Sequence, residues 1–426
     1  MKSIALTISC FIILMAGRLD LKASDTIVIK KSAPAPLVIT VPAGFSATTI
    51  LDSLGTNRHI AVSSNGDIYV KVERPVNGKG IMVLRESGGK ATIVNSFGTF
   101  AGSGIAIKNG YVYATTDDDV YRFKMNDKNE VAPNQEPEKI ITGLVNKRQH
   151  AAKTIALDDA GNIYVNIGAP SNSCQIKDRE NGSRGQDPCP ILEQAGGIWK
   201  FKADKLNQTY KDGSRYATGI RNGVAVFWNK EQNSLYVMQH GRDGLFQMFP
   251  SLYNAEEGAE LPAEEMLKVK EGANFGWPYC YYDEFQNKKI LAPEYGGDKK
   301  KQGRCSIVDT PVVAFPGHWA PNAILFYTGD QFPAKYKNGA FVAFHGSWNR
   351  APQNQKGYKV VFVPFANGKP SGNYEVFADG FAGSDALESP DDAVARPSGL
   401  AMAADGSLYI SDDVKGKIWK ISYAKK

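Results

Sequence analysis

One short pattern recurs six times along the chain and limits the folds that it can adopt. Each copy has an alternating apolar segment, a turn rich in Gly, Asn or Asp, and a second short strand with a central aromatic residue. The copies are HIAVSSNGDIYVKV (59–72), GIAIKNGYVYATT (104–116), TIALDDAGNIYVNIG (154–168), VAVFWNKEQNSLYVMQHG (224–241), YKNGAFVAFHGSWN (336–349) and LAMAADGSLYISDD (400–413). Turns of this kind between strands of period two are strong hairpin signals. The repeats therefore predict six β-hairpins.

Several of these hairpins are followed by one more alternating strand. The added strands are GIMVLRE (80–86), DDVYRFKM (118–125), GGIWKFKA (196–203), YKVVFVPF (358–365) and GKIWKISY (416–423). Antiparallel sheets of three or four strands, repeated in this way, are typical of blades arranged around an axis. We predict an all-β fold, a six-bladed β-propeller of four-stranded antiparallel blades over residues 24–426, with a pair of β-sandwiches as the alternative. Residues 255–272 are the best candidate for a short helix or a loop excursion.

Residues 1–23 have the features of a secretory signal peptide. Lys2 precedes an apolar run over residues 4–16, and a small residue stands at position 23. A membrane anchor, the alternative, needs about 20 apolar residues, whereas Arg18 follows the shorter run found here. We expect cleavage, export to the periplasm or the cell exterior, and no membrane span in the chain that remains.

The cysteines support an oxidising compartment. Cys10 would leave with the signal peptide, and the remaining chain keeps Cys174, Cys189, Cys280 and Cys305. Four cysteines allow three pairings, and the close-spaced pairing of the first two and of the last two would staple two loops rich in Gly, Pro and Asp. No pair has the C-x-x-C spacing, so zinc, redox-dithiol and covalent haem sites are disfavoured.

Polar residues gather just before the first strand or just after the second strand of the predicted hairpins. They are His150, Lys153, Arg221, Asn222, His240, Gly241, Arg242, Asp243, His318, His345 and Arg396. Four of the five histidines of the chain are in this set. In a propeller, corresponding strand ends of different blades converge on one mouth of the central channel. We therefore predict a single polar site at that mouth.

The predicted mouth is cationic. Guanidinium groups pair bidentately with carboxylates and keep their charge when partly buried, which favours a flat polycarboxylate as the ligand. The chain has no G-x-G-x-x-G after a strand and no P-loop, which disfavours a nucleotide. A formal net charge of +6 over 426 residues is too small to indicate nucleic-acid binding.

Several segments resemble those of a known enzyme family. They are QHAAKTIALDDAGNIYVNIG, TGIRNGVAVFW, MQHGRDGL, GANFGWPYC, HWAPNAILFYTGDQFP, HGSWNR and ARPSGLAMAADGSLYISDD. In this order they resemble the soluble pyrroloquinoline-quinone (PQQ) sugar dehydrogenases, and the L-sorbosone dehydrogenase-like branch looks most similar. The resemblance covers nearly all of the chain after the signal peptide. It implies a six-bladed propeller that holds PQQ and Ca²⁺ at one mouth.

The resemblance also implies roles for individual residues. His150 matches the general base that takes a hydroxyl proton while hydride passes to the quinone. Arg221 and Asn222 match the pair that faces the quinone carbonyl and stabilises its developing charge. The backbone carbonyls of Gly241 and Arg242 match the calcium ligands, since calcium prefers oxygen.

Four further cations and imidazoles complete the expected cofactor site. They are Lys153, His318, His345 and Arg396. Arg396 fits a cofactor carboxylate, and the imidazole of His345 stands where glucose-type relatives place a lysine. Relatives that oxidise sugars often carry an acid directly before the catalytic histidine, whereas this chain has Gln149. The substrate is therefore left open among an aldose, a sorbosone-like sugar aldehyde and a related alcohol.

Two other functions stay open at this point. One is a propeller that binds a carbohydrate without redox chemistry, and the other is a calcium-dependent lactonase or hydrolase on the same architecture. The presence of His150 with Arg221 and Asn222 favours the dehydrogenase. A dehydrogenase would also need an electron acceptor, either a cytochrome or a quinone, which the sequence does not identify.

Overall fold

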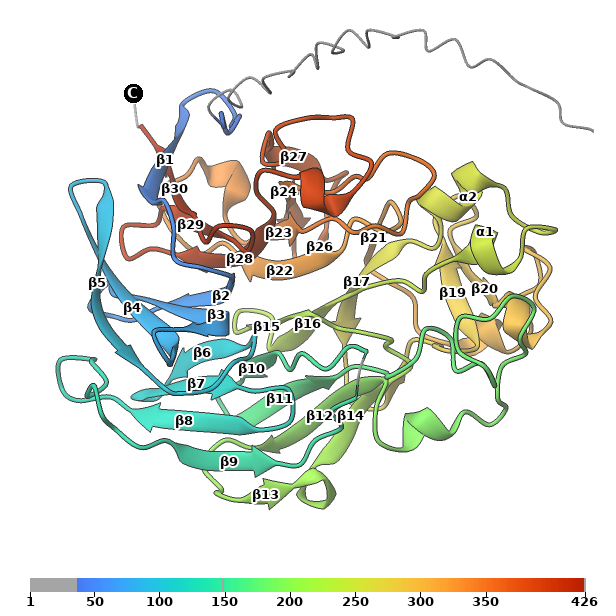
Figure 1. The fold of residues 1–426 in the computed structure, drawn as a ribbon, viewed down its shortest axis with the longest axis horizontal. Helices are drawn as coiled ribbons and strands as arrows, with labels where there is room; N and C mark the ends of the chain where they lie inside the picture. The colour runs from blue at the N-terminus through green and yellow to red at the C-terminus, as the bar shows by residue number, and fades with distance from the viewer. Residues whose placement is uncertain (1–36, 148, 425–426) are drawn as a thin grey trace, which may run out of the picture. The chain divides into compact units, whose positions relative to one another are not determined.

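The computed structural model describes residues 37–147 and 149–424, so the signal peptide predicted at 1–23 lies outside the described residues. Within these residues, six sheets follow one another in chain order, as the colour gradient of Figure 1 shows. The innermost strands of all six sheets line one central cavity of about 360 Å³. The predicted six-bladed β-propeller is confirmed.

Each blade is a meander whose first strand is innermost. Blade 1 contains β2 (Asn57–Val62), β3 (Ile68–Val76), β4 (Lys79–Ser87) and β5 (Lys90–Phe97). Blade 2 contains β6 (Ile105–Lys108), β7 (Tyr111–Thr115), β8 (Val120–Lys124) and β9 (Glu138–Thr142). Blade 3 contains β10 (Ile155–Leu157), β11 (Asn162–Ile167), β12 (Gly197–Lys202) and β14 (Ser214–Thr218). These blades come directly from the repeats, because each N-G, D-G or G-N turn closes a hairpin.

The last three blades follow the same plan. Blade 4 contains β15 (Ala225–Asn229), β16 (Ser234–Gln239), β17 (Glu264–Val269) and β21 (Val313–Phe315). Blade 5 contains β22 (Pro321–Phe326), β23 (Ala340–Phe344), β24 (Lys359–Val363) and β27 (Glu375–Ala378). Blade 6 contains β28 (Pro397–Met402), β29 (Leu408–Asp412), β30 (Ile418–Tyr423) and β1 (Phe45–Leu51).

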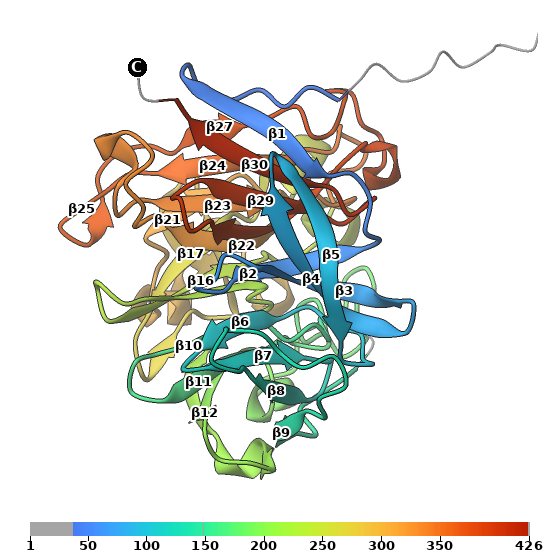
Figure 2. The same ribbon diagram turned by 90° about the vertical axis from the view of Figure 1, so that its left-hand side faces the viewer.

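The sixth blade joins the two ends of the propeller. Its three inner strands come from the C-terminal end of the chain, whereas its outer strand, β1, comes from the N-terminal end. The register runs antiparallel from Phe45 opposite Tyr423 to Leu51 opposite Ile418, and Figure 2 shows the blue β1 beside the dark red β30. This pairing closes the ring of blades through backbone hydrogen bonds.

Short elements outside the blade plan extend the loops. The added strands are β13 (Gln208–Thr209), β18 (Ala273–Asn274), β19 (Cys280–Asp283), β20 (Lys288–Leu291), β25 (Phe365–Ala366) and β26 (Lys369–Pro370). The helical elements are α1 (Leu245–Met248), α2 (Ala255–Glu260) and the 3₁₀ turns η1 (Pro190–Glu193), η2 (Tyr210–Asp212), η3 (Pro293–Tyr295), η4 (Gly303–Ile307), η5 (Ala334–Tyr336) and η6 (Pro390–Asp392). Strands β13 and β18 pair in parallel with the outer strands β9 and β14, so two blades have a fifth strand.

The hydrophobic core lies between neighbouring blades. Phe341 and Phe362 of blade 5 pack in one cluster with Leu408 and Trp419 of blade 6. The other blade pairs have clusters of the same kind, for example blades 2 and 3. Neighbouring blades cover both faces of each blade. Each large apolar side chain that is fully buried between them stabilises the fold by roughly 1.5–3 kcal/mol relative to an exposed one. The blades therefore form a rigid support for the loops at the mouth.

The structure refines two sequence-based expectations and confirms a third. The fifth hairpin begins earlier than the YKNGAFVAFHGSWN repeat, because its first strand is β22 and the connection includes η5. Residues 255–272 contain the short helix α2, but their second half forms strand β17. The expected disulfides, Cys174–Cys189 and Cys280–Cys305, are both present, with Cα atoms 6.2 and 5.7 Å apart. The described residues include no helix long and apolar enough to span a membrane.

Candidate functional site

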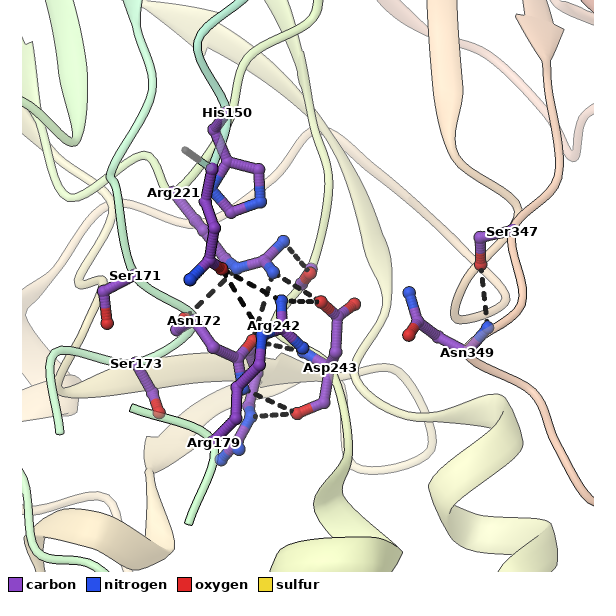
Figure 3. A network of polar contacts seen from close by, with 12 residues as sticks. His150, Ser171, Asn172, Ser173, Arg179, Arg221, Arg242, Asp243, Ser347 and Asn349 are labelled. Carbon is purple, nitrogen blue, oxygen red and sulfur yellow. Dashed lines mark hydrogen bonds and ion pairs between the residues drawn. The ribbon is translucent and has the colours of Figure 1, made fainter. Parts of the chain in front are cut away.

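The polar residues predicted at strand ends gather at one mouth of the propeller, at the start of the innermost strands. On the side of blades 3 and 4, Arg221 and Asp243 form one network with their partners, and His150 lies beside it (Figure 3). On the side of blades 5, 6 and 1, His345 and Arg396 form a second network with Asp413. We call these the blade 3–4 network and the blade 5–6 network.

His150 is held in an orientation that leaves one ring nitrogen available. Its Nδ1 lies 2.5 Å from the carbonyl oxygen of Ala169 at the end of β11. A carbonyl only accepts, so Nδ1 carries the proton and Nε2 is an unprotonated acceptor. Within the described chain, no hydrogen bond to Nε2 is formed. His150 therefore has the geometry of a general base.

The backbone around His150 is closely packed. Its φ of 53° lies in the left-handed region, which costs energy for a residue with a side chain. A Cβ atom at Gly168 would lie 2.6 Å from the His150 carbonyl oxygen and 3.0 Å from Oδ1 of Asn222. Glycine is therefore required at this position, because His150 and Asn222 both pack directly against the backbone of residue 168.

Burial and the positive charge of Arg221 together lower the pKa of His150 to about 3, against the opposing effect of the Ala169 carbonyl. The imidazole is therefore neutral at physiological pH. A neutral imidazole is the form that accepts a proton.

Arg221 is buried among oxygen atoms. Its Nε donates to the carbonyl of Asn172 at 3.1 Å, and its Nη1 donates to the carbonyl of Gly241 at 2.8 Å. Its Nη2 donates to Oδ1 of Asn172 at 3.1 Å and to Oδ2 of Asp243 at 2.6 Å. The guanidinium is thus fixed in place by charge-assisted bonds, which are stronger than neutral ones.

Asp243 is shared by two arginines. Besides Arg221, its Oδ2 accepts from Nη2 of Arg179 at 2.8 Å. Burial alone would raise the pKa of Asp243, but Arg221, His318 and Arg179 hold it well below its usual range. The carboxylate is therefore ionised at the mouth and balances part of the positive charge there.

Gln149, which stands where sugar-oxidising relatives often carry an acid, is also fixed. Its amide nitrogen donates to Oδ2 of Asp178 at 2.7 Å, and its amide oxygen accepts from Arg179 at 3.2 Å. Asp178 in turn accepts from the hydroxyl of Ser171 at 2.6 Å. The loop closed by the Cys174–Cys189 disulfide therefore places the Asp178 carboxylate against Gln149, the residue directly before His150.

Buried ion pairs attach the long insertion of blade 4 to this network. Nη1 of Arg242 lies 2.7 Å from Oε1 of Glu294, and Nζ of Lys289 lies 2.6 Å from Oε2 of Glu265. Glu294 also accepts from the hydroxyl of Ser173 at 2.9 Å. The Arg242 side chain therefore points into the insertion, where Glu294 balances its charge.

The blade 5–6 network has a different arrangement. Nε2 of His345 lies 2.5 Å from Oδ2 of Asp413, and its Nδ1 lies 2.8 Å from Nη2 of Arg396. Because the guanidinium only donates, His345 accepts at Nδ1 and donates at Nε2. Arg58 donates to the same Asp413 oxygen at 3.0 Å. Both ring nitrogens of His345 are thus occupied by protein groups.

Two further predicted cofactor ligands are engaged by backbone carbonyls, and one of them, His318, borders the blade 3–4 network. Lys153 is fully buried, and its ammonium donates to the carbonyl of Ala151. Burial lowers its pKa to about 8. His318 is buried with Nε2 3.1 Å from the carbonyl of Gly258, while its Nδ1 lies 3.8 Å from Asp243. In this conformation, neither side chain is directed at a ligand in the mouth.

The blade 3–4 network contains oxygen donors of the kind that calcium binds, and in this structure they accept from Arg221. No cluster of three or more His, Cys, Asp or Glu side chains that could hold a metal occurs in residues 37–147 and 149–424. The carbonyls of Gly241 and Asn172 and the side-chain oxygens of Asn172 and Asp243 converge on one cation, the Arg221 guanidinium. Such oxygens are the ligands that calcium prefers.

The cations of the mouth fit a polycarboxylate. In addition to Arg221 and Arg396, the mouth includes Arg58, whose buried Nε has no hydrogen-bond partner among the described residues. An unpaired buried donor costs free energy, so an anionic ligand that accepted from it would be stabilised. Burial also lowers the pKa of Arg396, which a carboxylate ligand would offset.

Sequence reasoning did not single out Asn172, Arg179, Asp413 or Arg58. Asp413 follows directly after β29, which is the same kind of position as the predicted residues and could have been included. Arg179 lies instead in the loop closed by the Cys174–Cys189 disulfide, and Asn172 lies just before that loop, in a stretch without a periodic pattern. Their position depends on how that loop folds, which the repeats do not predict.

The family profile described as TrAA12-like matches residues 39–424. The chain belongs to the TrAA12-like family. Curated relatives include an uncharacterised protein of Borreliella burgdorferi, 28% identical over 283 residues, which are 66% of this chain and 62% of that protein. The PQQ-dependent pyranose dehydrogenase of Coprinopsis cinerea is 25% identical in an alignment of 438 positions that covers 93% of this chain and 56% of that enzyme. The PQQ-dependent sugar dehydrogenase of Hypocrea jecorina is 23% identical in an alignment of 420 positions that covers 91% of this chain and 89% of that protein.

Solved structures of TrAA12-like relatives have the same fold. A calcium structure of the Trichoderma reesei family AA12 enzyme superposes with a TM-score of 0.72 at 20% identity, covering 91% of this chain and 98% of the other. The holo form of the PQQ domain of the Coprinopsis cinerea pyranose dehydrogenase gives 0.71 at 20% identity, covering 92% and 98%. The chain spans less than two thirds of the length of the Borreliella and Coprinopsis proteins.

Proposed function

We propose that this TrAA12-like protein is a PQQ- and calcium-dependent dehydrogenase that oxidises a hydroxyl group of an aldose, of a hydrated sugar aldehyde or of a related alcohol. The observation that carries the proposal is the position of His150. Its Nδ1 is fixed by the Ala169 carbonyl, its Nε2 has no partner in the described chain, and it lies in the field of Arg221. The Coprinopsis and Hypocrea relatives, which are named PQQ-dependent dehydrogenases, support the choice of cofactor.

In this proposal, His150 moves a proton and Arg221 stabilises charge. Nε2 of His150 takes the proton of the substrate hydroxyl, and the Ala169 carbonyl keeps the ring oriented as the imidazolium forms. PQQ, when bound, supplies the two-electron acceptor for the hydride, and calcium supplies a positive charge that polarises it. Arg221 is held by Asn172 and Asp243 so that its charge does not have to reorganise during the reaction.

Other residues of the mouth bind rather than react. Arg221, Asn222 and Arg396 are the candidate contacts of the cofactor, and the backbone carbonyls of Gly241 and Arg242 are the candidate ligands of calcium. The carbonyl of Gly241 already accepts from Arg221, so a cation there would share it with the guanidinium. Lys153, His318 and His345 would have to exchange protein contacts for cofactor contacts, so we rank them lower.

The two other functions receive less support. A lactonase built around a central metal needs several acidic or amide ligands, and the described residues have no cluster of three or more acidic, cysteine or histidine side chains. A binding protein without redox chemistry would not need a strained histidine with a free Nε2 beside a buried arginine. A sorbosone-like aldehyde stays within the proposed substrate range, and the two disulfides support the proposed export.

A reconstitution experiment tests the proposal. The purified protein is incubated with PQQ and Ca²⁺, and reduction of a redox dye is followed with a panel of aldoses and aldehydes. We expect a shifted visible spectrum of the bound cofactor, a higher melting temperature that is lost on chelation, and dye reduction with at least one sugar. An unchanged spectrum and melting temperature in the presence of both additions would contradict it.

A further inference from the structure

A cavity of about 240 Å³ lies beside the blade 3–4 network, and none of the roles assigned above uses it. Its lining consists of Arg179, Asp243, Gly244, Gln247, Met248, Trp348 and Asn349. The volume is below the range of roughly 300–1,000 Å³ that is usual for drug-sized ligands. It therefore suits a small polar ring, such as one monosaccharide unit.

Trp348 provides the flat face of this cavity. It is 70% exposed, although tryptophan is usually well buried. The loop that carries it is firmly attached, because Ser347 donates to the carbonyl of His318 at 3.1 Å and Arg350 is buried with Glu260 at 2.5 Å. The backbone on both sides of Trp348 is therefore fixed, which keeps the ring at the edge of the cavity. A fixed aromatic face can stack against the C–H groups of a sugar ring.

Polar groups around the ring have free hydrogen-bonding capacity. Gln247 donates to the carbonyl of Ala351 at 2.9 Å, which leaves its amide oxygen to face the cavity. The side-chain amide of Asn349 makes no hydrogen bond with the described residues, and Nη1 of Arg179 makes none either. An aromatic face with separate donors and acceptors matches the mixed apolar and hydroxyl surface of a sugar.

The charges of the cavity balance one another. Arg179 is paired with Asp243 at 2.8 Å and lies 4.0 Å from Asp178. Its guanidinium can therefore donate to a ligand without an excess of positive charge at the site. This balance favours a neutral hydroxylated ring over an anionic one.

The cavity lies on the far side of Asp243 from the reacting group. Asp243 contacts Arg221, next to His150, with the same oxygen that accepts from Arg179. Figure 3 shows Asn349 on the side of Asp243 that is turned away from Arg221. The Arg179–Asp243 pair is thus the boundary that the cavity shares with the blade 3–4 network, so the cavity adjoins the place of the reacting ring without coinciding with it.

We propose that this cavity is a second sugar subsite, in which Trp348 stacks on the ring next to the one that is oxidised, so that the preferred substrate is a neutral disaccharide or longer oligosaccharide. The inference rests on the proposed function for the reacting ring. The recognition of the second ring depends only on Trp348, Gln247, Asn349 and Arg179.

Kinetics of the loaded enzyme test the subsite. Wild type, Trp348→Ala and Trp348→Phe are compared with glucose, cellobiose and maltose, and Phe285→Ala is the control for an exposed aromatic residue outside the cavity. Aromatic contacts of this kind correspond to roughly a twofold to tenfold effect. We expect Trp348→Ala to lower kcat/KM for at least one disaccharide by this factor, mainly through KM, with glucose unchanged and with Phe restoring most of the loss. Equal losses for glucose and both disaccharides, or no loss, would overturn the proposal.

A binding measurement separates this inference from the proposed function. Protein without PQQ is titrated with methyl β-cellobioside and methyl β-maltoside, and tryptophan fluorescence is recorded for wild type and Trp348→Phe. We expect a saturable change with at least one glycoside in wild type that is absent in the variant. Such a change without any dye reduction would refute the dehydrogenase and keep the subsite. Dye reduction with no fluorescence change and no disaccharide preference would refute the subsite alone.

Discussion

The two networks at the mouth stabilise buried charge in different ways. In the blade 3–4 network, the arginine is enclosed by oxygens that come from long insertions, such as Asn172 and Asp243. In the blade 5–6 network, His345, Asp413 and Arg396 all stand at strand ends and satisfy one another directly. The first arrangement leaves a histidine nitrogen free, whereas the second leaves none.

This difference separates groups that can react from groups that can only bind. His150 has one fixed and one free nitrogen, so it can exchange a proton without losing its orientation. His345 would have to break its contact with Asp413 or Arg396 to do the same. The free nitrogen on the fixed ring of His150 is thus the reason to expect proton transfer on the side of blades 3 and 4.

The largest contrast is expected from the two histidines. We expect His150→Ala in the loaded enzyme to lower kcat by roughly 10² to 10⁴, the usual contribution of a positioned general base, with PQQ affinity and melting temperature nearly unchanged. We expect His345→Ala to lower cofactor affinity or stability more than kcat at saturating PQQ. Dye-reduction rates per bound PQQ measure both variants. Near-wild-type turnover in His150→Ala would contradict the role of His150 as the general base.

The next contrast concerns the two arginines. We expect Arg221→Met to destabilise the protein by about 3–5 kcal/mol, because it leaves the buried Asp243 with Arg179 as its remaining hydrogen-bonded cation. Arg396→Met removes hydrogen bonds from a less buried position and should cost about 1–3 kcal/mol. Urea unfolding of the cofactor-free protein measures both values. Adding Asp243→Asn to Arg221→Met should recover part of the loss, and failure to do so would show that the pair is not the cause.

The repeats predict the propeller well, and the reason is physical. Strand alternation and tight turns are local properties, so the segment LAMAADGSLYISDD is enough to predict the hairpin β28–β29. The pairing of β1 with β30 depends on the two ends of the chain meeting, and no local signal marks it. The sequence pattern predicts a start of the fifth hairpin that is too far along the chain, because a connection with a 3₁₀ turn, and not a tight turn, joins β22 to β23.

The same distinction applies to the candidate site. Arg396 and His345 are predictable because they stand next to strands, and the propeller brings such positions together. The roles of Asn172 and Arg179 depend on a loop whose conformation is set by the Cys174–Cys189 disulfide and by bonds such as Gln175 to the backbone of Arg179. The occupation of both nitrogens of His345 also depends on side-chain geometry, which spacing in the sequence does not determine.

A smaller effect is expected from the disulfides. Loss of Cys174–Cys189 should cost about 3 kcal/mol, which is the value for a loop of about 15 residues. Loss of Cys280–Cys305, 25 residues apart, should cost a similar amount. Only the first change should also raise KM and lower PQQ affinity, because that loop carries Arg179, whose guanidinium pairs with the Asp243 carboxylate that holds Arg221. Alanine replacements at both cysteines of each pair test this. Equal effects on KM would contradict the distinction between the loops.

The smallest effect is the acid sensitivity contributed by His150. Burial holds its pKa at about 3 in the folded protein, whereas the unfolded chain has the ordinary value of about 6.5. The unfolded state therefore binds the proton first, so the free energy of unfolding is unaffected above about pH 6.5 and falls as the pH drops toward the folded pKa. The slope for one such histidine is about 1.4 kcal/mol per pH unit.

The variant His150→Gln isolates this contribution, because glutamine does not titrate. His59, which is buried with a pKa lowered to about 4 by burial, stays in both proteins and contributes equally. Urea unfolding of the cofactor-free proteins at pH 4.5, 5.5 and 6.5 should therefore give a shallower decline for the variant, by about one proton. Identical slopes would mean that His150 is not kept neutral by the fold. Nε2 of His150 would then already be protonated in mild acid. It could no longer be contrasted with His345 as the nitrogen that is free to accept a proton.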